Sequence, residues 1–136
     1  MQHITYYFIA LVIKLKGVKK AFSKAPIDYL KLRKDDIHSP KSSDVLGLKF
    51  HTIQIEKSLV TEILPQENPS ENVILYCHGG ASIYGPTDLN WNSIAKIVKG
   101  TNTKAYLVDY PKAPEHQITE TNRMIFLASC LLSKYR

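Results

Sequence analysis

The sequence contains little cysteine and no long apolar run. Its two cysteines, Cys77 and Cys130, lie far apart and in apolar stretches, so we expect both to be reduced core residues of a cytoplasmic protein. The uncharged stretch Ile4–Ile13 is shorter than the ~20 apolar residues that a membrane-spanning helix needs. No lysine or arginine precedes it and no clear small-residue cleavage pattern follows it, so we expect no secretory signal.

Motifs for metals, nucleotides and nucleic acids are also missing. No pair of histidine, cysteine or carboxylate residues stands at the spacing of metal ligands on a recognisable element, so we predict no metal and no cofactor. Residues 80–87 resemble the phosphate-binding pattern Gly-x4-Gly-Lys-Thr, but Pro86 replaces the lysine that reaches the phosphates and lacks an N–H. Only saturable binding in a nucleotide titration would support that alternative. No basic groove with interleaved aromatic residues occurs, so we expect no nucleic-acid partner.

Acidic residues are outnumbered by basic ones. The chain has 12 Asp and Glu against 18 Lys and Arg, which gives a formal net charge of +6. Many of the basic residues stand early in the chain: Lys14, Lys16, Lys19, Lys20, Lys24, Lys31, Arg33 and Lys34. Such a cluster is attracted to an anionic membrane surface, and we keep weak contact of residues 1–24 with a membrane open. The preferred interpretation is the solvated face of an amphipathic helix.

The composition as a whole is that of a globular domain with a helical segment in front of it. The chain has 136 residues, of which 44% are hydrophobic and 22% charged. Between Met1 and Lys24 apolar residues recur at steps of four and three, as on one face of a helix: Ile4, Phe8, Leu11, Leu15, Val18 and Phe22. A second short helix is predicted over Ala25–Lys34, with Pro26 in its first turn. Asp35–Gly47 has the composition of a loop, and we expect a hinge there.

The rest of the chain predicts an α/β fold. Leu48–Lys57 alternates and changes parity midway, which predicts a bulge or an edge strand, and Ser58–Leu64 would pair with it antiparallel. Val73–Cys77 and Ala105–Val108 are apolar runs that favour buried parallel strands. Helices are predicted between and after these runs, over Asp88–Val98 and Thr119–Tyr135. The connection between the two runs would be right-handed, so the loops that follow them should meet at one edge of the sheet.

The loop after the first of these runs has unusual chemistry. Val73–Cys77 is followed at once by His78, Gly79 and Gly80. Paired glycines allow positive φ and let backbone N–H groups approach a ligand closely. A loop of exposed N–H donors at the carboxyl end of a buried strand is suited to bind an anionic oxygen.

These residues resemble a known family. His78–Ala81 is similar to the His-Gly-Gly-Gly loop of the hormone-sensitive-lipase-like α/β-hydrolases, which are carboxylesterases and lipases. Asp109–His116 is similar to that family's Asp-Tyr-x-Leu-Ala-Pro-Glu segment, and the two stretches come in the same order and at a fitting spacing. The resemblance implies the N-terminal portion of an α/β-hydrolase fold. Residues 1–47 would form a mobile helical cap segment and linker, and residues 48–136 a partial hydrolase core.

By the same resemblance, the first loop is an oxyanion hole. The backbone N–H groups of Gly79, Gly80 and Ala81 would stabilise the tetrahedral oxyanion of an acyl ester, with a further donor beyond the nucleophile. The resemblance implies that His78 orients the loop and is not a base. Ala81 stands where the family has its third glycine, so its Cβ narrows the acyl side or opposes the φ that the loop requires.

The second stretch is implied to be structural. Asp109, Tyr110 and Glu115 would support this edge of the sheet, because the catalytic acid of the family follows its nucleophile along the chain. Lys112 departs from the family's leucine, and Gln117-Ile118 departs from its proline-rich continuation. These departures affect the expected local packing more than the expected fold.

The family's nucleophile pattern, Gly-x-Ser-x-Gly, does not occur in these 136 residues. Ser82 comes closest, with Gly80 two residues before it, but Tyr84 stands two residues after it. We therefore interpret Ser82 as a loop residue and assign no nucleophile, catalytic acid or catalytic histidine. A complete hydrolase of this fold runs to ~200–250 residues, so we expect a fragment that stops before the nucleophile strand.

Two functions follow from these observations. The first is the N-terminal fragment of a carboxylic-ester hydrolase that is inactive alone and would act on a small acyl ester if completed. The second is a non-catalytic remnant or partner module. In that case an unpaired edge of the sheet would favour self-association.

Overall fold

The computed structural model describes residues 2–15, 17, 23, 26–40, 47–67 and 69–133. In chain order its elements are α1 (Gln2–Leu15), α3 (Tyr29–Leu32), the 3-10 helix η1 (Arg33–Asp35), β1 (Lys49–Ile55), β2 (Ser58–Leu64), β3 (Ser70–Cys77), α4 (Asp88–Thr101), β4 (Thr103–Asp109) and α5 (Ile118–Ser133). The chain divides into two units, Met1–Lys31 and Leu32–Arg136. This division lies before the expected one at residue 47, and the cap role of residues 1–47 stays a prediction.

Helix α1 confirms the predicted first helix as far as Leu15, and most of its expected continuation to Lys24 lies outside the described residues. Of the lysines expected on its polar face, only Lys14 falls within α1. The second predicted helix is present as α3 and η1, although it begins after Pro26 and not at it. None of the helices that the structure describes is long and apolar enough to cross a membrane.

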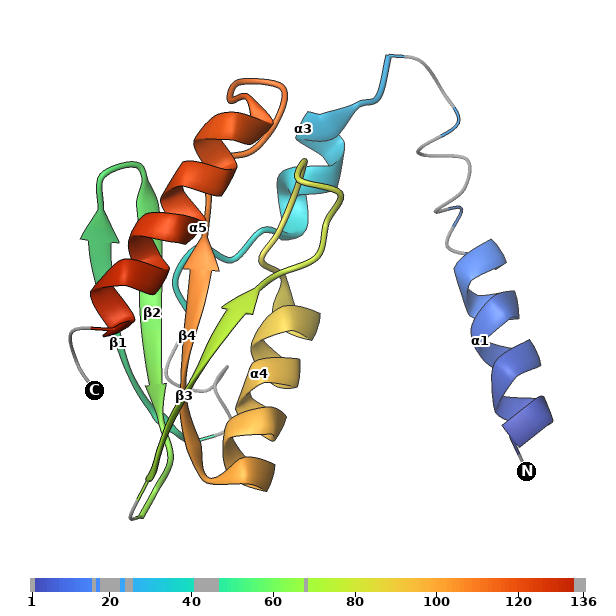
Figure 1. The fold of residues 1–136 in the computed structure, drawn as a ribbon. Helices are drawn as coiled ribbons and strands as arrows, with labels where there is room; N and C mark the ends of the chain where they lie inside the picture. Colours follow the sequence, from blue (N-terminus) through green and yellow to red (C-terminus); the bar gives the residue numbers. More distant parts are fainter. Residues whose placement is uncertain are drawn as a thin grey trace. The chain divides into compact units, whose positions relative to one another are not determined.

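A four-stranded sheet in the order β1-β2-β4-β3 forms the centre of the second unit (Figure 1). β1 pairs with β2 and β2 with β4 in antiparallel fashion, whereas β3 and β4 are parallel. The predicted antiparallel pair and the parallel pair joined by a helix are thus confirmed. β4, the last strand among the described residues, is thus an interior strand of the sheet, between β2 and β3.

Two expectations for the strands need correction. The pairing of β1 with β2 is continuous from Lys49 to Ile55, so β1 contains no bulge and is an edge strand only. β3 was expected to be buried on both faces, but none of its residues is buried. Its last residue, Cys77, is exposed and not a core residue. The reason is position, since the structure shows β3 paired with β4 on one side alone.

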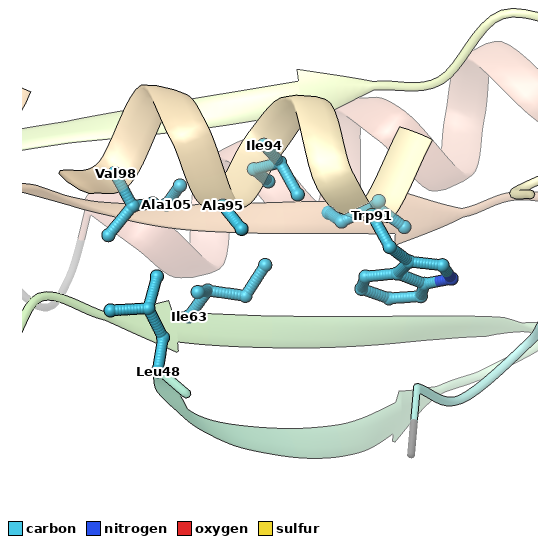
Figure 2. Packing of buried hydrophobic residues seen from close by; sticks show 8 residues of the cluster. Leu48, Ile63, Trp91, Ile94, Ala95, Val98 and Ala105 are labelled. Carbon is cyan, nitrogen blue, oxygen red and sulfur yellow. The ribbon is translucent and has the colours of Figure 1, made fainter. Parts of the chain in front are cut away.

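The two long helices of the second unit cover opposite faces of this sheet. Successive side chains of a strand point to opposite faces. In β4, Ala105 and Leu107 belong to a cluster with α4, while Tyr106 and Val108 belong to a cluster with Ala128 of α5. Figure 2 shows the α4 cluster, which contains Leu48, Ile63, Trp91, Ile94, Ala95, Val98, Ala105 and Leu107.

Helix α4 begins and ends with recognisable signals. Thr87 is its N-cap, and the N–H of Thr87 donates to Asn90 Oδ1 at 2.8 Å, in a capping box. The C-cap is Asn102, whose left-handed φ of 49° ends the helix three residues beyond the predicted end at Val98. The helix therefore connects the loop after β3 to the start of β4 with little freedom at either end.

Candidate active site

The loops that follow β3 and β4 lie beside each other at the carboxyl edge of the sheet. Cys77 of β3 is the register partner of Val108 of β4, so His78 and Asp109 each come directly after the paired residues. The backbone N–H of Ala113 donates to Ser82 O at 2.8 Å and joins the two loops directly. The structure thus brings the two sequence motifs together, while the roles assigned to their residues stay predictions.

The conformation of the first loop depends on Gly80. Its φ is +128°, and a Cβ at this position would lie 2.0 Å from Tyr84 O, so no other residue fits. Gly80 O accepts hydrogen bonds from the N–H groups of Ile83 and Tyr84, which closes a tight turn. Inside this turn Ala81 and Ser82 have φ values of 54° and 56°, in the left-handed region. The alanine in place of a third glycine therefore adopts a glycine-like backbone at some cost in energy.

Two backbone N–H groups of this turn have no hydrogen-bond partner among the described residues. Among the described residues, the N–H groups of Gly80 and Ala81 make no hydrogen bond. Gly79 and Ala81 are exposed, and a Cβ on Gly79 would meet nothing within 4 Å. The arrangement has what an oxyanion site needs on one side, namely accessible N–H groups held by a rigid turn.

His78 lies beneath the loop and not in it. Its side chain is fully buried, its Nδ1 is 2.8 Å from Gly79 O, and its ring stacks on that of Tyr110 with centroids 4.4 Å apart. Its Nε2 lies 3.7 Å from Asp109 Oδ1 and has no hydrogen-bond partner in the described part of the chain. A general base must reach a proton of the substrate, and a ring without solvent access does not. The geometry agrees with an orienting role.

Tyr110, directly after β4, connects the loop after β4 to the loop after β3. It is buried, and its hydroxyl donates to His78 O at 2.6 Å. Burial, with the nearby Cys77 and Asp109, raises the pKa of the Tyr110 hydroxyl, so the group stays a neutral donor at ordinary pH. This contact agrees with the predicted supporting role.

Asp109 is buried and bonds to two side chains, the buried Lys112 and the exposed His38. Its carboxylate bonds to Lys112 through one oxygen and to His38 Nδ1 at 2.6 Å through the other. Burial alone would raise the pKa of Asp109, but His78, Lys112 and His38 together bring it below its ordinary value. Lys112, which replaces the family's leucine, is therefore not a disruption: it is a buried cation paired with a buried anion.

Arg33 connects the two loops from outside them. Its Nε donates to Ile83 O at 2.8 Å, and one of its terminal nitrogens donates to Ala113 O at 2.7 Å. The same guanidinium binds both carboxylate oxygens of Glu115 at 2.8 Å, which lowers the pKa of Glu115. Glu115 supports the edge by holding this arginine. Sequence reasoning missed Arg33, because nothing in its basic surroundings distinguishes it from a solvated side chain.

The expected hinge is anchored to the site in its described part, residues 36–40. Asp36 Oδ1 accepts from Gly85 N at 2.6 Å, Ile37 N donates to Pro86 O at 2.7 Å, and Trp91 Nε1 donates to Ile37 O at 2.8 Å. Burial raises the pKa of Asp36 despite its bond to Gly85. The hinge expectation is wrong for these residues, since a segment bonded at successive residues to the loop after β3 is part of its support.

A hollow of about 400 Å³ lies beside this edge, but not over the predicted oxyanion loop. It is lined by Arg33, Asp36, His38, Lys57, Leu59, Asp109, Tyr110, Pro111, Lys112, Glu115 and His116. The His38–Asp109 pair in it resembles an oriented base, yet none of the described residues that line the hollow is a serine, threonine or cysteine for that base to activate. Ser82 makes no side-chain hydrogen bond to a histidine or carboxylate among the described residues. Among the described residues, no group of three or more histidine, cysteine, aspartate or glutamate side chains could hold a metal ion.

Comparisons with known proteins agree with this architecture. Residues 74–132 match the sequence model of a family described by the α/β hydrolase fold. The crystal structure of a candidate esterase from Staphylococcus aureus matches with a TM-score of 0.67 at 23% identity, covering 88% of this chain and 39% of that one. An esterase of the bacterial hormone-sensitive lipase family matches with a TM-score of 0.60 at 18% identity, covering 71% of this chain and 32% of that one.

A thermostable esterase from Pseudomonas putida has a TM-score of 0.51 at 24% identity, over 60% of this chain and 26% of that one. No curated protein sequence matches significantly. At these identities the likeness shows the fold. The chain spans less than two fifths of the length of each of these structures.

Proposed function

We propose that this chain, which has the N-terminal portion of an α/β-hydrolase fold, supplies the oxyanion-binding side of a carboxylic-ester hydrolase and does not hydrolyse esters by itself. One observation carries the proposal. Among the residues that the structure describes, the N–H groups of Gly80 and Ala81 make no hydrogen bond, and they stand at the carboxyl end of a parallel strand, where α/β proteins bind their ligands.

The support of the loop strengthens this interpretation. An oxyanion hole is effective when its donors are fixed before the charge develops, so that no reorganisation is needed. Here Arg33, Asp36 and Tyr110 each bond to the backbone of the loop, at Ile83, Gly85 and His78. The substrate class of the completed enzyme would be a small acyl ester, and the description of the structural neighbours as esterases supports an ester substrate.

The absence of turnover follows from chemistry. Ester hydrolysis through an acyl-enzyme needs a nucleophile beside a base, and these 136 residues contain no Gly-x-Ser-x-Gly. Among the described residues, Ser82 has no hydrogen bond to a base, its sequence lacks the second glycine of the nucleophile turn, and His78 is buried. The chain thus holds donors for a negative oxygen without the groups that generate one.

A chimera tests the oxyanion role. The chain replaces the matching segment of the Staphylococcus aureus candidate esterase, and turnover of a short-chain p-nitrophenyl ester is measured beside the parent protein. In an active chimera, Gly80→Ala displaces the turn and should lower kcat by ~10²–10³, the usual effect of losing an oxyanion donor. Gly100→Ala in α4, outside the loop, is the matched control, because its Cβ meets nothing within 4 Å. A chimera whose kcat is unchanged by Gly80→Ala would contradict the assignment.

The isolated chain tests the absence of activity. We expect no saturable ester turnover above the uncatalysed rate. Saturable turnover that disappears in the Ser82→Ala variant would make Ser82 a nucleophile and overturn this part of the proposal.

A non-catalytic partner module is the second candidate, and the edge of β3 favours it. Within the described residues β3 pairs with β4 alone, and such an edge accepts another strand. The exposed Cys77 at the end of β3 reports on this edge. In a Cys130→Ser background, a dimer by light scattering with Cys77 protected from a maleimide would support pairing through β3. A monomer whose Cys77 reacts freely would argue against it.

A further inference from the structure

We propose that α1, together with the lysines that follow it, binds the surface of an anionic phospholipid membrane. This inference concerns the first unit alone and does not depend on the proposed hydrolase function. It begins from a mismatch between the composition of α1 and its surroundings.

α1 is apolar around its whole circumference. Of its 14 residues only Lys14 is charged. At 100° per residue, the consecutive side chains of Tyr6, Tyr7, Phe8 and Ile9 already point in all directions around the axis. The predicted lysine face depended mainly on Lys16, Lys19 and Lys20, which lie outside the described residues, so that prediction is not tested. A helix that is apolar all round is normally buried in a protein core or in lipid.

The side chains of α1 are nevertheless exposed. The large apolar ones between half and three quarters exposed are Tyr6, Tyr7, Phe8, Ile9, Leu11, Ile13 and Leu15. No side chain from Tyr6 to Leu15 is buried. So large an exposed apolar surface marks a site of interaction with a partner or a membrane.

Charge identifies the partner. Lys14, Lys16, Lys19 and Lys20 follow the apolar stretch within seven positions, and no acidic residue occurs before Asp28. Lysines do not bind the apolar acyl chain that lies under a cap helix. A basic cluster directly after an apolar helix instead complements the negative charge of anionic lipid headgroups. The two adjacent tyrosines at 6 and 7 suit the membrane interface, where amphipathic rings accumulate.

Length decides the mode of binding. A helix of 14 residues is about 21 Å long, less than the ~30 Å of the hydrocarbon core. α1 therefore enters one leaflet without crossing the membrane. The lysines remain at the headgroups, so the attachment should be reversible and sensitive to salt.

Co-sedimentation of the full chain with vesicles tests the proposal. We expect binding to vesicles of phosphatidylcholine mixed with phosphatidylglycerol, much weaker binding to phosphatidylcholine alone, and release as salt is raised. Phe8→Asp should lower the affinity at least 10-fold, roughly the value of one buried aromatic side chain. Phe126→Asp is the matched control, because Phe126 of α5 is 65% exposed and Phe8 is 66% exposed.

A second pair of variants tests the role of charge. Lys14→Glu with Lys16→Glu should lower the affinity for the anionic vesicles on the order of 25-fold or more, since each lysine near the surface contributes about fivefold. Lys96→Glu with Lys99→Glu changes the net charge equally on the exposed side of α4 and should leave binding within about twofold.

Three results would overturn the proposal. One is the absence of binding to either vesicle, and another is binding that ignores headgroup charge and the Lys14 and Lys16 variants. The third is a loss of stability of the second unit in Phe8→Asp without lipid, as large as that of a core substitution. That result would mean that α1 packs on the chain's own core.

Discussion

β3 and β4 are neighbouring parallel strands with similarly apolar sequences, yet they differ in burial. β4 is buried at every residue except Lys104, whereas β3 is buried at none. β4 has β2 on one side and β3 on the other, and helices cover both of its faces. The composition of a strand thus indicates that it belongs to a sheet interior, but its neighbours decide whether it is the centre or the edge.

The loops after the two strands differ in a corresponding way. The loop after β4 is held by charged residues of its own, Asp109, Lys112 and Glu115. The loop after β3 has no carboxylate, lysine or arginine and is held by the geometry of Gly80 and by bonds from Arg33 and Asp36. The loop after β4 uses charge and the loop after β3 uses backbone conformation, and in the latter the N–H groups of Gly80 and Ala81 make no hydrogen bond among the described residues.

The largest expected difference in stability is between truncations of a leucine in β4 and of a leucine in β3. Leu107→Ala at the centre should lower the free energy of unfolding by about 3–5 kcal/mol, because Leu107 is fully buried between α4 and the sheet. Leu75→Ala in β3 removes the same atoms from a half-buried position and should cost about 1–2 kcal/mol. Urea denaturation followed by circular dichroism measures both. Equal losses would mean that β3 is covered in solution.

The next largest loss of stability is expected when the carboxylate of Asp109, at the start of the loop after β4, is removed. Asp109→Asn leaves the buried Lys112 without its anion and should cost about 3 kcal/mol at neutral pH, less if the amide oxygen replaces the acceptor. Because the pKa of Asp109 is lowered on folding, its stabilisation is present above the ordinary value of 3.8 and is lost as pH falls through the folded pKa. The variant should lack that acid loss in urea titrations below pH 4.

Asp36→Asn is the matched control for that measurement. The pKa of Asp36 is raised on folding, so its charge opposes folding above that pKa and the penalty disappears as pH falls. The amide oxygen of asparagine still accepts from Gly85, so stability at neutral pH should be unchanged or higher. A loss equal to that of Asp109→Asn would show that the two carboxylates do not differ as described.

A somewhat smaller loss of stability is expected when Gly80 in the loop after β3 is replaced. Gly80→Ala places a Cβ 2.0 Å from Tyr84 O at a φ of +128°, and should cost about 2–3 kcal/mol as the turn shifts. Gly79→Ala has open space and an ordinary φ, and should change stability by less than about 0.5 kcal/mol. Thermal denaturation of the pair checks this contrast. Similar losses in both variants would remove Gly80 as the determinant of the turn.

The smallest change in stability is expected at Ser82, whose backbone lies in the left-handed region. Ser82→Gly relieves a φ of 56° and should stabilise the protein by about 1 kcal/mol or less, because the gain is offset by the entropy of glycine in the unfolded chain. Ser93→Gly within α4 should destabilise by about 1 kcal/mol. Opposite signs in the same denaturation assay are the expected outcome.

Much of the fold was readable from local patterns. The strands predicted at Ser58–Leu64 and Ala105–Val108 and the helix predicted over Asp88–Val98 are present as β2, β4 and α4, because apolar periodicity and strand-length apolar runs are local signals. The two motif loops could be placed at one edge from the handedness of the crossover alone. These features depend on residues near each other in the chain.

The supports of the candidate site were not readable in this way. Arg33, Asp36 and His38 come from a segment that looks like a helix end and a hinge, and their partners stand roughly 50 to 80 positions later in the chain. A single arginine or aspartate carries no local signal of such a distant partner. The same holds for Lys112, which looked like a departure from a motif and is the counter-ion of Asp109.

The sequence by itself determined the element types, the parallel pair and the glycine loop, because backbone propensity, apolar periodicity and the freedom of Gly80 act over a few residues. The tertiary structure alone decided that β3 is an edge among the described strands, that Cys77 is exposed and that Arg33 and Asp36 bond to the loop after β3. Burial and pairing depend on which distant segments come together, and that information is distributed over the whole chain.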